Sequence, residues 1–289
     1  MVRIVVDSTS DLTNERIAEL GVTSVPLFVH FGEETYLDGV NLSAEEFYVK
    51  MEEREWMAKT AQPSPEFFEK AFRSILDDGD DVLAILVSSG VSGTVQSANV
   101  AKSHLESGHE RVMILDTQTC TSGLALLVEI AAKKAKEGMG LQELHDEIER
   151  LSKRTKVFAA IETLKYVKRG GRLSGPAAIV GTMLNLHPIM AMKNGEVINI
   201  TAVKGKKRMY QKLRQYAMEH GVDKSYPMFF SHGVVPERME KMRECFAEKF
   251  DMKQALFGIA GCIVGTYSGP GILIFAFIEK GKGLTNQST

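Results

Sequence analysis

The feature of this sequence that most restricts its fold is a unit that occurs three times in the first half of the chain. Each copy has a continuous apolar run, then a loop rich in Ser and Thr, then a helical pattern, and the copies span residues 3–21, 81–108 and 111–138. Apolar strands that alternate with helices are typical of a parallel sheet covered on both faces. The loops that follow parallel strands lie along one edge of such a sheet, and ligands bind there. We therefore expect a binding site built from the three hydroxyl-rich loops.

The second half of the sequence has a different pattern, which predicts a second domain. A strand and a short helix lead to a Gly170-Gly171 break, and the stretch 187–200 predicts a β-hairpin with Asn194-Gly195 as its turn. The predicted fold class is α/β with two domains: an N-terminal parallel-sheet α/β/α domain and a C-terminal α/β domain with a largely antiparallel sheet. The predicted bounds are 1–155 and 156–283, followed by a flexible polar tail at 284–289.

Composition and charge exclude several classes of partner. The 289 residues are 44% hydrophobic and carry a formal net charge of −2, so nucleic acid is not an expected partner. No apolar run approaches the roughly 20 residues of a membrane helix, and the N-terminus lacks a signal-peptide pattern. We therefore expect no stable membrane insertion and a cytoplasmic location. Cys120, Cys245 and Cys262 form neither a disulfide framework nor a zinc pattern, so we expect no metal and no cofactor.

The loop of the second copy, SSGVSGTVQSA at 88–98, has the features of an anion site. The first N–H groups of a helix lack partners within it, and the helix dipole is positive at that end. Ser92 and Thr94 add hydroxyl donors without bulk, and Gly90 and Gly93 allow a ligand to approach the backbone closely. The alternative interpretation is that Ser92 or Thr94 only caps the helix.

The anion need not be a phosphate, and a carboxylate fits this loop equally well. No Walker lysine follows these loops, and no acidic residue is placed to bind a ribose. Thr60 is expected on a loop, just before a helix that Pro65 begins and Ser64 caps. From there, Thr60 and Ser92 could donate to the two oxygens of a carboxylate.

A second dense motif, KRGGRLSG at 168–175, places Arg172 after a tight glycine turn. An arginine in that position can pair with both oxygens of a carboxylate or a phosphate. The alternative interpretation is a solvated basic turn after a helix.

The sequence gives weak support for a catalytic triad. The seven histidines are scattered, and the stretch 89–93 resembles a nucleophile elbow but has its first glycine misplaced. His232 could reach the domain junction, and the alternative is a buried structural role. A hydrolase with Ser92 as nucleophile, or a small-molecule kinase that binds phosphate with the hydroxyl loops, remains the alternative function.

An ordered set of motifs resembles the DegV family of bacterial fatty-acid-binding proteins over almost the full length of the chain. The motifs are DSTSDL at 7–12, TAQPSPEFF at 60–68, SSGVSGTVQSA at 88–98, DTQTCTSGLALLV at 116–128, LKYVKRGGRLSG at 164–175 and GTYSGPG at 265–271. The resemblance implies a two-domain protein that encloses one long-chain fatty acid in an apolar tunnel between its domains. It also implies a carrier without catalysis of its own. A separate ATP-dependent fatty acid kinase would convert the presented acid to an acyl-phosphate for phospholipid synthesis.

The resemblance also assigns roles to residues of this sequence. It implies that the carboxylate lies near Thr60, Ser92, Gly93 and Tyr267, and that Arg172, the arginine of the family's GGR motif, orients the acid or assists its hand-off. The residues expected to support this site from behind are Ser8, Ser89, Thr94 and Thr119.

Two positions depart from the family pattern. Tyr267 stands where the family commonly has histidine, and Ala61 stands where serine is usual. Tyrosine donates a hydrogen bond through its hydroxyl but cannot act as an imidazole near neutral pH. The change at Tyr267 therefore affects delivery to a kinase more than carboxylate binding. It also leaves open a third function, a lipid-responsive interaction protein.

The acyl chain is expected to supply most of the affinity. Burying one methylene contributes about 0.8 kcal/mol, so a sixteen-carbon chain offers on the order of 11 kcal/mol before ordering costs. A charge-assisted hydrogen bond contributes roughly 1.5–3 kcal/mol, so the hydroxyl loops would mainly set orientation. The residues whose apolar neighbourhood makes them candidates for the tunnel wall are Phe158, Met183, Ile189, Met190 and Met192.

Overall fold

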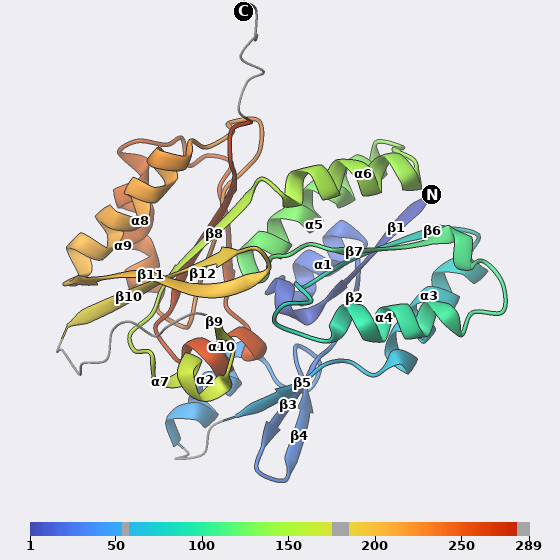
Figure 1. Ribbon diagram of the computed structural model, residues 1–289, viewed down its shortest axis with the longest axis horizontal. Coiled ribbons are helices and arrows are strands. Elements are labelled where there is room, and N and C mark those ends of the chain that lie inside the picture. Colours follow the sequence, from blue (N-terminus) through green and yellow to red (C-terminus); the bar gives the residue numbers. More distant parts are fainter. Residues whose placement is uncertain (54–57, 175–184, 282–289) are drawn as a thin grey trace, which may run out of the picture.

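The computed structural model describes residues 1–53, 58–174 and 185–281. Two large sheets lie on either side of one buried helix, and a small third sheet lies at one end of the molecule (Figure 1). None of the helices in these ranges is long and apolar enough to cross a membrane.

The first sheet is formed by the apolar runs of the threefold repeat. Its strand order is β2-β1-β6-β7 and every neighbouring pair is parallel. The strands are β1 (Val2–Asp7), β2 (Thr23–Val25), β6 (Asp81–Leu86) and β7 (Val112–Asp116). The hydroxyl-rich loops leave this sheet at the carboxyl ends of its strands, which confirms the expected arrangement.

Helices pack on both faces of the first sheet. Phe68 and Phe72 of α3 and Ala98 of α4 are buried on one face, whereas α5 and α6 contribute Leu124 and Ile148 on the other. The helices are α1 (Asn14–Leu20), α3 (Pro65–Asp77), α4 (Thr94–Ser103), α5 (Thr121–Lys136) and α6 (Leu141–Ser152). Ser64 occupies the N-cap of α3 as predicted, but its side chain makes no capping hydrogen bond.

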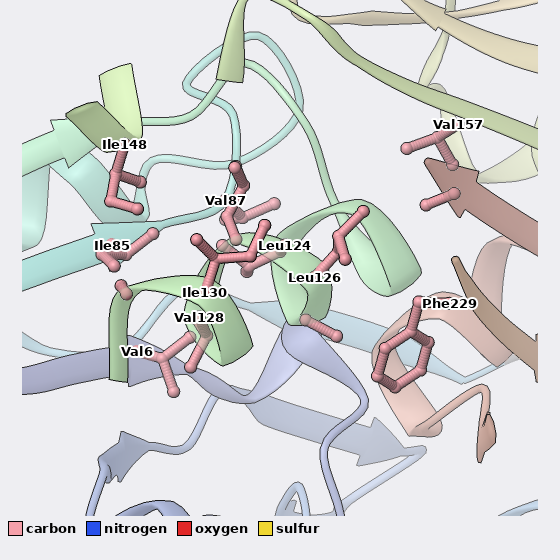
Figure 2. Packing of buried hydrophobic residues seen from close by; sticks show 14 of the residues in the cluster. Val6, Ile85, Val87, Leu124, Leu126, Val128, Ile130, Ile148, Val157 and Phe229 are labelled. Atoms are coloured by element: carbon pink, nitrogen blue, oxygen red, sulfur yellow. The ribbon is translucent and has the colours of Figure 1, made fainter. Parts of the chain in front are cut away.

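Helix α5 is shared by the two large sheets. Its residues from Thr121 to Ala132 are all buried, whereas a helix on a protein surface buries only one stripe. Figure 2 shows the apolar side chains of α5 between Val6 and Ile85 of the first sheet and Val157 and Phe229 of the second. A single apolar core therefore continues from one sheet through α5 to the other.

The second sheet has seven strands in the order β13-β12-β14-β8-β10-β11-β9. Four of its neighbouring pairs are antiparallel, and β12–β13 and β11–β9 are parallel. The strands are β8 (Thr155–Ala160), β9 (Leu173–Ser174), β10 (Leu186–Lys193), β11 (Glu196–Lys204), β12 (Phe229–His232), β13 (Leu256–Ile259) and β14 (Leu273–Ile278). The predicted α/β class, with one parallel and one largely antiparallel sheet, is confirmed.

Strands β10 and β11 form the predicted hairpin. Asn194 and Gly195 are its turn, with φ angles of 51° and 79°, and a two-residue turn of this kind requires positive φ at both positions. Two helices, α8 (Lys206–His220) and α9 (Pro236–Ala247), cover the face of the second sheet that lies away from α5 (Figure 1).

A third sheet carries Thr60, and the prediction that Thr60 lies on a loop is wrong. The order is β4-β3-β5, and the backbone of Thr60 pairs with Val29. A three-residue edge strand is too short to show an alternating pattern in the sequence. The elements of this region are β3 (Phe28–Phe31), β4 (Glu34–Leu37), α2 (Ala44–Glu53), β5 (Lys59–Ala61), α7 (Lys165–Gly170) and α10 (Cys262–Ser268).

The division into domains at 1–155 and 156–283 stays a proposal. Strand β8, the first strand of the second sheet, begins at Thr155. The predicted tail at 284–289 lies outside the described residues.

Candidate functional site

A cavity of about 350 Å³ lies where the loops of the first sheet meet the second sheet and α10. Most of its wall is apolar, as expected for a site that holds a hydrocarbon. The apolar lining residues are Leu27, Ala61, Val87, Val91, Val157, Ala159, Ile161, Val167, Met190, Ala191, Met192, Val197, Ile263, Val264, Ile272 and Ile274. The lining residues with polar side chains are Thr9, Thr60, Gln62, Ser92, Cys120, Thr121, Arg172, Tyr267 and Ser268.

The alternation of strands decides which candidate tunnel residues reach the cavity. Met190 and Met192 line it. Phe158 and Ile189 do not, because they belong to the apolar cluster under α8 on the other face of the second sheet. The expectation for these two residues is therefore wrong, since an apolar neighbourhood does not show on which face of a strand a side chain lies. Met183 lies outside the described residues.

Tyr267 of α10 is the centre of a polar group on the cavity wall. Its hydroxyl lies 2.6 Å from Oγ1 of Thr60, and either atom can donate. The guanidinium carbon of Arg172 lies 4.9 Å from the centroid of the Tyr267 ring, a cation–π contact. The structure thus brings together three residues that the sequence analysis names from three separate motifs.

The two positions before Arg172 require glycine for different structural reasons. A Cβ on Gly170 would overlap with the ring of Tyr267, so a glycine there lets the ring lie flat against the backbone. Gly171 ends α7 with a φ of 67°, which favours glycine. Arg172 then donates from Nη1 to the carbonyl of Gly170 at 2.9 Å and from Nε to the carbonyl of Val91 at 3.4 Å.

Ser92, Gly93 and Thr94 lie at the start of α4. The hydroxyls of Ser92 and Thr94 are 2.8 Å apart, and Ser92 lines the cavity. Gly93 is the N-cap, and no side chain caps the helix. The interpretation of this loop as a simple helix cap is therefore not supported, and the first N–H groups of α4 keep no side-chain acceptor.

Gln62 is a lining residue that the sequence analysis does not single out. A Cβ on Gly93 would overlap with Oε1 of Gln62, and Nε2 of Gln62 donates to the hydroxyl of Ser97 at 2.9 Å. Gln62 thus fills the space that a glycine leaves beside the helix start. Its position in the motif TAQPS is the only signal in the sequence.

The four residues expected behind the site lie outside the cavity lining. The hydroxyl of Ser8 accepts from the backbone N–H of Leu27 at 3.1 Å. Ser89 donates to Oδ2 of Asp116 at 2.5 Å. The other two, Thr94 and Thr119, are buried. The hydroxyls of Ser8, Ser89 and Thr94 make hydrogen bonds, whereas the hydroxyl of Thr119 has no hydrogen-bond partner. None of the four residues lines the cavity.

Two buried carboxyl groups lie behind hydroxyls of the wall, and the sequence analysis does not assign them a role. Thr9 donates from Oγ1 to Asp7 at 2.5 Å, and the hydroxyl of Thr121 donates to Asp11. Burial raises the pKa of Asp7 to about 6 and the pKa of Asp11 to about 8. Because Thr9 and Thr121 direct their hydroxyl protons to these carboxyls, those protons do not face the cavity.

The described part of the chain places no histidine beside Ser92 to act as its base. No histidine of the described residues lines the cavity. His232 accepts the backbone N–H of Val235 at Nδ1, at 3.1 Å, and burial lowers its pKa, as in a structural histidine. Within the described ranges, no group of three or more His, Cys, Asp or Glu side chains is placed to hold a metal ion.

Comparison with known proteins agrees with the motifs. The sequence model of the DegV family, described as an uncharacterised protein family, matches residues 1–280. A DegV domain-containing protein of Caldanaerobacter subterraneus subsp. tengcongensis is 31% identical over 280 residues, which cover 96% of this chain and 99% of the relative. A DegV domain-containing protein of Deinococcus radiodurans is 36% identical over 224 residues, covering 76% and 79% of the two chains.

Solved structures of similar fold include proteins described as fatty-acid-binding. The fatty-acid-binding DegV family protein of Thermus thermophilus is 31% identical, with a TM-score of 0.85 and coverage of 96% of this chain and 99% of that one. A stearic-acid-binding protein of Eubacterium ventriosum is 26% identical, with a TM-score of 0.85 and coverage of 97% and 99%. The chain therefore belongs to the DegV family.

Proposed function

We propose that this protein binds one long-chain fatty acid in the cavity between its two large sheets. The observation that carries this proposal is the apolar cavity with the Thr60–Tyr267 hydroxyl pair and the Arg172 guanidinium on its wall. The fatty acids of the Thermus thermophilus and Eubacterium ventriosum relatives support it.

The hydroxyl pair suits a carboxylate because two hydroxyls that share one hydrogen bond still have one proton to give. In the pair Thr60–Tyr267, one hydroxyl donates to the other, and the second proton is available to an oxygen of the ligand. The pair Ser92–Thr94 has the same property. The uncapped start of α4 at Gly93 adds backbone N–H donors and the positive end of a helix dipole. We place the carboxylate among Thr60, Ser92, Gly93 and Tyr267.

Arg172 is proposed to orient the carboxylate and to assist its transfer. Its side chain lines the cavity, yet the residue is exposed. A cation with one side toward the ligand and the other toward solvent can contact both the acid and a second protein. We propose that this second protein is a fatty acid kinase, that it makes an acyl-phosphate for phospholipid synthesis in the cytoplasm, and that the present chain performs no catalysis itself.

Identification of the bound lipid tests the proposal most directly. Protein purified from its own cells would be denatured gently and extracted, and the extract analysed by mass spectrometry. We expect one long-chain acid per protein, and delipidated protein should take up added palmitate with the same stoichiometry. Repeated recovery of lipid-free protein that also fails to bind palmitate would end the proposal. Turnover of an acyl ester that is lost in Ser92→Ala would instead support a hydrolase.

A further inference from the structure

A second hollow lies on the face of the second sheet opposite the cavity. A groove of about 820 Å³ follows α8 and α9, and its lining shares no residue with the cavity. Among the described residues, seven buried side-chain nitrogen or oxygen atoms lack a hydrogen-bond partner, and five of them belong to His187, Tyr210 and Arg238. Tyr210 and Arg238 line the groove. Three of the seven atoms therefore belong to residues that line the groove.

The unpartnered groups in the lining are hydrogen-bond donors. Tyr210 is 6% exposed, and its hydroxyl has no partner. The side chain of Arg238 is 13% exposed; its Nη2 lies 2.6 Å from Oε1 of Glu162 but is not aligned for a hydrogen bond, and its Nε has no partner. His187 lies behind, with Nδ1 3.6 Å from the same Glu162 oxygen. A buried donor without an acceptor costs roughly 1–3 kcal/mol, which an acceptor in the groove would offset.

The starts of α8 and α9 meet at one end of this groove. Arg214 of α8 donates to the carbonyl of Cys245 at 2.9 Å and pairs with Glu248, near the end of α9. Strands β11 and β12, which lead into the two helices, point the same way in the second sheet, and the first residues of both helices line the groove. The residues before them, Gly205 and Val235, make no side-chain capping hydrogen bond. The first turn of α8 thus presents unpaired N–H groups to the groove, and both helices present positive dipole ends. In α9 only Glu237 can add a first-turn N–H, because Pro236 has none and the N–H of Arg238 donates to the carbonyl of Val235 at 3.0 Å.

The charges at this end favour an anion. Lys206, Lys207 and Arg238 line it from the first turns of the two helices, and Glu237 is the one carboxylate in those turns that lines the groove. The remaining acidic lining residues lie farther along: Glu244 in a later turn of α9 and Glu248 at its C-cap. Arginine and helix N-termini are the groups that proteins use to bind phosphate oxygens.

We propose that the end of the groove formed by the starts of α8 and α9 is a binding site for a phosphate group. Arg238 and Tyr210 donate hydrogen bonds to its oxygens, the first-turn N–H groups of α8 add to them, and Lys206 and Lys207 supply charge. The second sheet separates this site from the acid cavity, so the two ligands occupy different places. The phosphate can be free or part of a lipid headgroup, since both present the same oxygens.

The test uses the full-length protein and inorganic phosphate. Thermal unfolding would be followed with phosphate and with chloride at matched ionic strength, because a ligand that binds only the folded state raises the unfolding temperature. We expect phosphate-specific stabilisation of the wild type, and at least about a tenfold weaker apparent affinity in Arg238→Gln. Arg243→Gln is the matched control, because Arg243 lies on the same helix, is exposed and pairs with Glu240; it should bind phosphate like the wild type.

Tyr210→Phe keeps the proposal testable should Arg238→Gln fail to fold. Without phosphate this variant should be as stable as the wild type or more so, because it loses an unpartnered hydroxyl, and its phosphate-dependent stabilisation should be smaller. If Tyr210 and Arg238 have only structural roles, the variants unfold earlier with and without phosphate by the same amount, and the proposal is overturned.

Vesicles distinguish the two sources of phosphate. Co-sedimentation of the wild type, but not of Arg238→Gln, with phosphatidic acid vesicles and not with phosphatidylcholine vesicles assigns the site to a lipid headgroup. Stabilisation by inorganic phosphate without such co-sedimentation assigns it to a free anion. Equal behaviour of wild type and Arg238→Gln in both assays overturns the proposal.

Discussion

The hydroxyl of Ser88 donates a hydrogen bond of 2.7 Å to the carbonyl oxygen of Gly195, and this bond joins the second hydroxyl-rich loop to the turn of the β10–β11 hairpin. The approach is close, because a Cβ on Gly90 would lie 2.5 Å from the same oxygen. The hairpin carries Met190 and Met192 of the cavity wall. This contact thus joins one wall of the cavity to the second hydroxyl-rich loop.

Loss of this bond should speed the release of a bound acid. We expect Ser88→Ala to cost about 1 kcal/mol of unfolding free energy and to raise the rate at which a fluorescent fatty acid dissociates. Stopped-flow displacement by unlabelled palmitate measures that rate. Ser103→Ala is the control, because its hydroxyl bonds only the carbonyl of Val100 within α4. Unchanged release from Ser88→Ala would show that the hairpin turn does not limit escape.

Removal of the headgroup hydroxyls should weaken binding only modestly. In Thr60→Ala combined with Ser92→Ala, we expect about a 10- to 100-fold rise in the dissociation constant for palmitate, since the acyl chain supplies most of the affinity. Titration calorimetry on delipidated protein measures it. A loss of more than about a thousandfold would contradict the dominance of the chain.

Arg172 should matter for transfer and not for binding. Arg172→Ala is expected to bind palmitate within a few-fold of the wild type but to slow acyl-phosphate formation by a cognate kinase by at least about tenfold. Lys168→Ala is the control, since Lys168 belongs to the same basic motif but does not line the cavity. Wild-type transfer in Arg172→Ala would remove this residue from the mechanism.

Gly170 should be intolerant of a side chain. In Gly170→Ala the new Cβ overlaps with the ring of Tyr267, which must move away from Thr60 and Arg172. We expect a loss of roughly 1–3 kcal/mol in unfolding free energy and weaker palmitate binding than in the wild type. Gly140→Ala is the control because nothing lies within 4 Å of its Cβ. Wild-type affinity in Gly170→Ala would show that the position of Tyr267 is not part of the site.

The buried carboxyl of Asp11 should make stability depend on pH. Its folded pKa of about 8 lies above the unfolded value, so the folded state holds the proton more tightly. The unfolding free energy then falls as pH rises from about 4 to about 8, with a limiting slope of about 1.4 kcal/mol per pH unit. Asn in its place can still accept from Gly261, whose N–H lies 2.8 Å from Oδ1.

We therefore expect Asp11→Asn to gain stability relative to the wild type as pH rises through this range. Urea unfolding of both proteins at pH 4, 6 and 8 provides the comparison, and it cancels the titration of the other carboxyls that the two proteins share. A constant difference between the two proteins at all three values would contradict a raised pKa for Asp11.

The sequence predicts single strands and turns better than it predicts which distant residues come into contact. The apolar runs of β1, β6 and β7 and the Asn194-Gly195 turn depend on local physics, so a single stretch of sequence indicates them. The contact of Thr60 with Tyr267 joins residues 207 positions apart, and no local pattern shows it. The resemblance to the DegV family named both residues, but only the fold brings their hydroxyls together.

The sequence also does not show where in the fold a residue is buried. Asp7 and Asp11 stand in a polar stretch, DSTSD, that resembles an exposed loop, yet both are buried and accept hydroxyl protons of the wall. Phe158 and Ile189 are apolar and buried, as their sequence context indicates, but they face the apolar cluster under α8 and not the cavity. Composition indicates that a residue can be buried, and only the packing of the sheets shows where.

The position of helix α5 between the two large sheets affects how the protein unfolds. The side chains of α5 pack against both the parallel sheet and the largely antiparallel sheet. Unfolding of either sheet together with α5 would therefore expose apolar side chains of the other sheet to water, so we expect the two to unfold together. Calorimetry of the intact chain should therefore record one transition where a pair of loosely tethered lobes would give two. A fragment that ends after this helix would expose the apolar surface of α5 that packs against the second sheet, and it would be prone to aggregate.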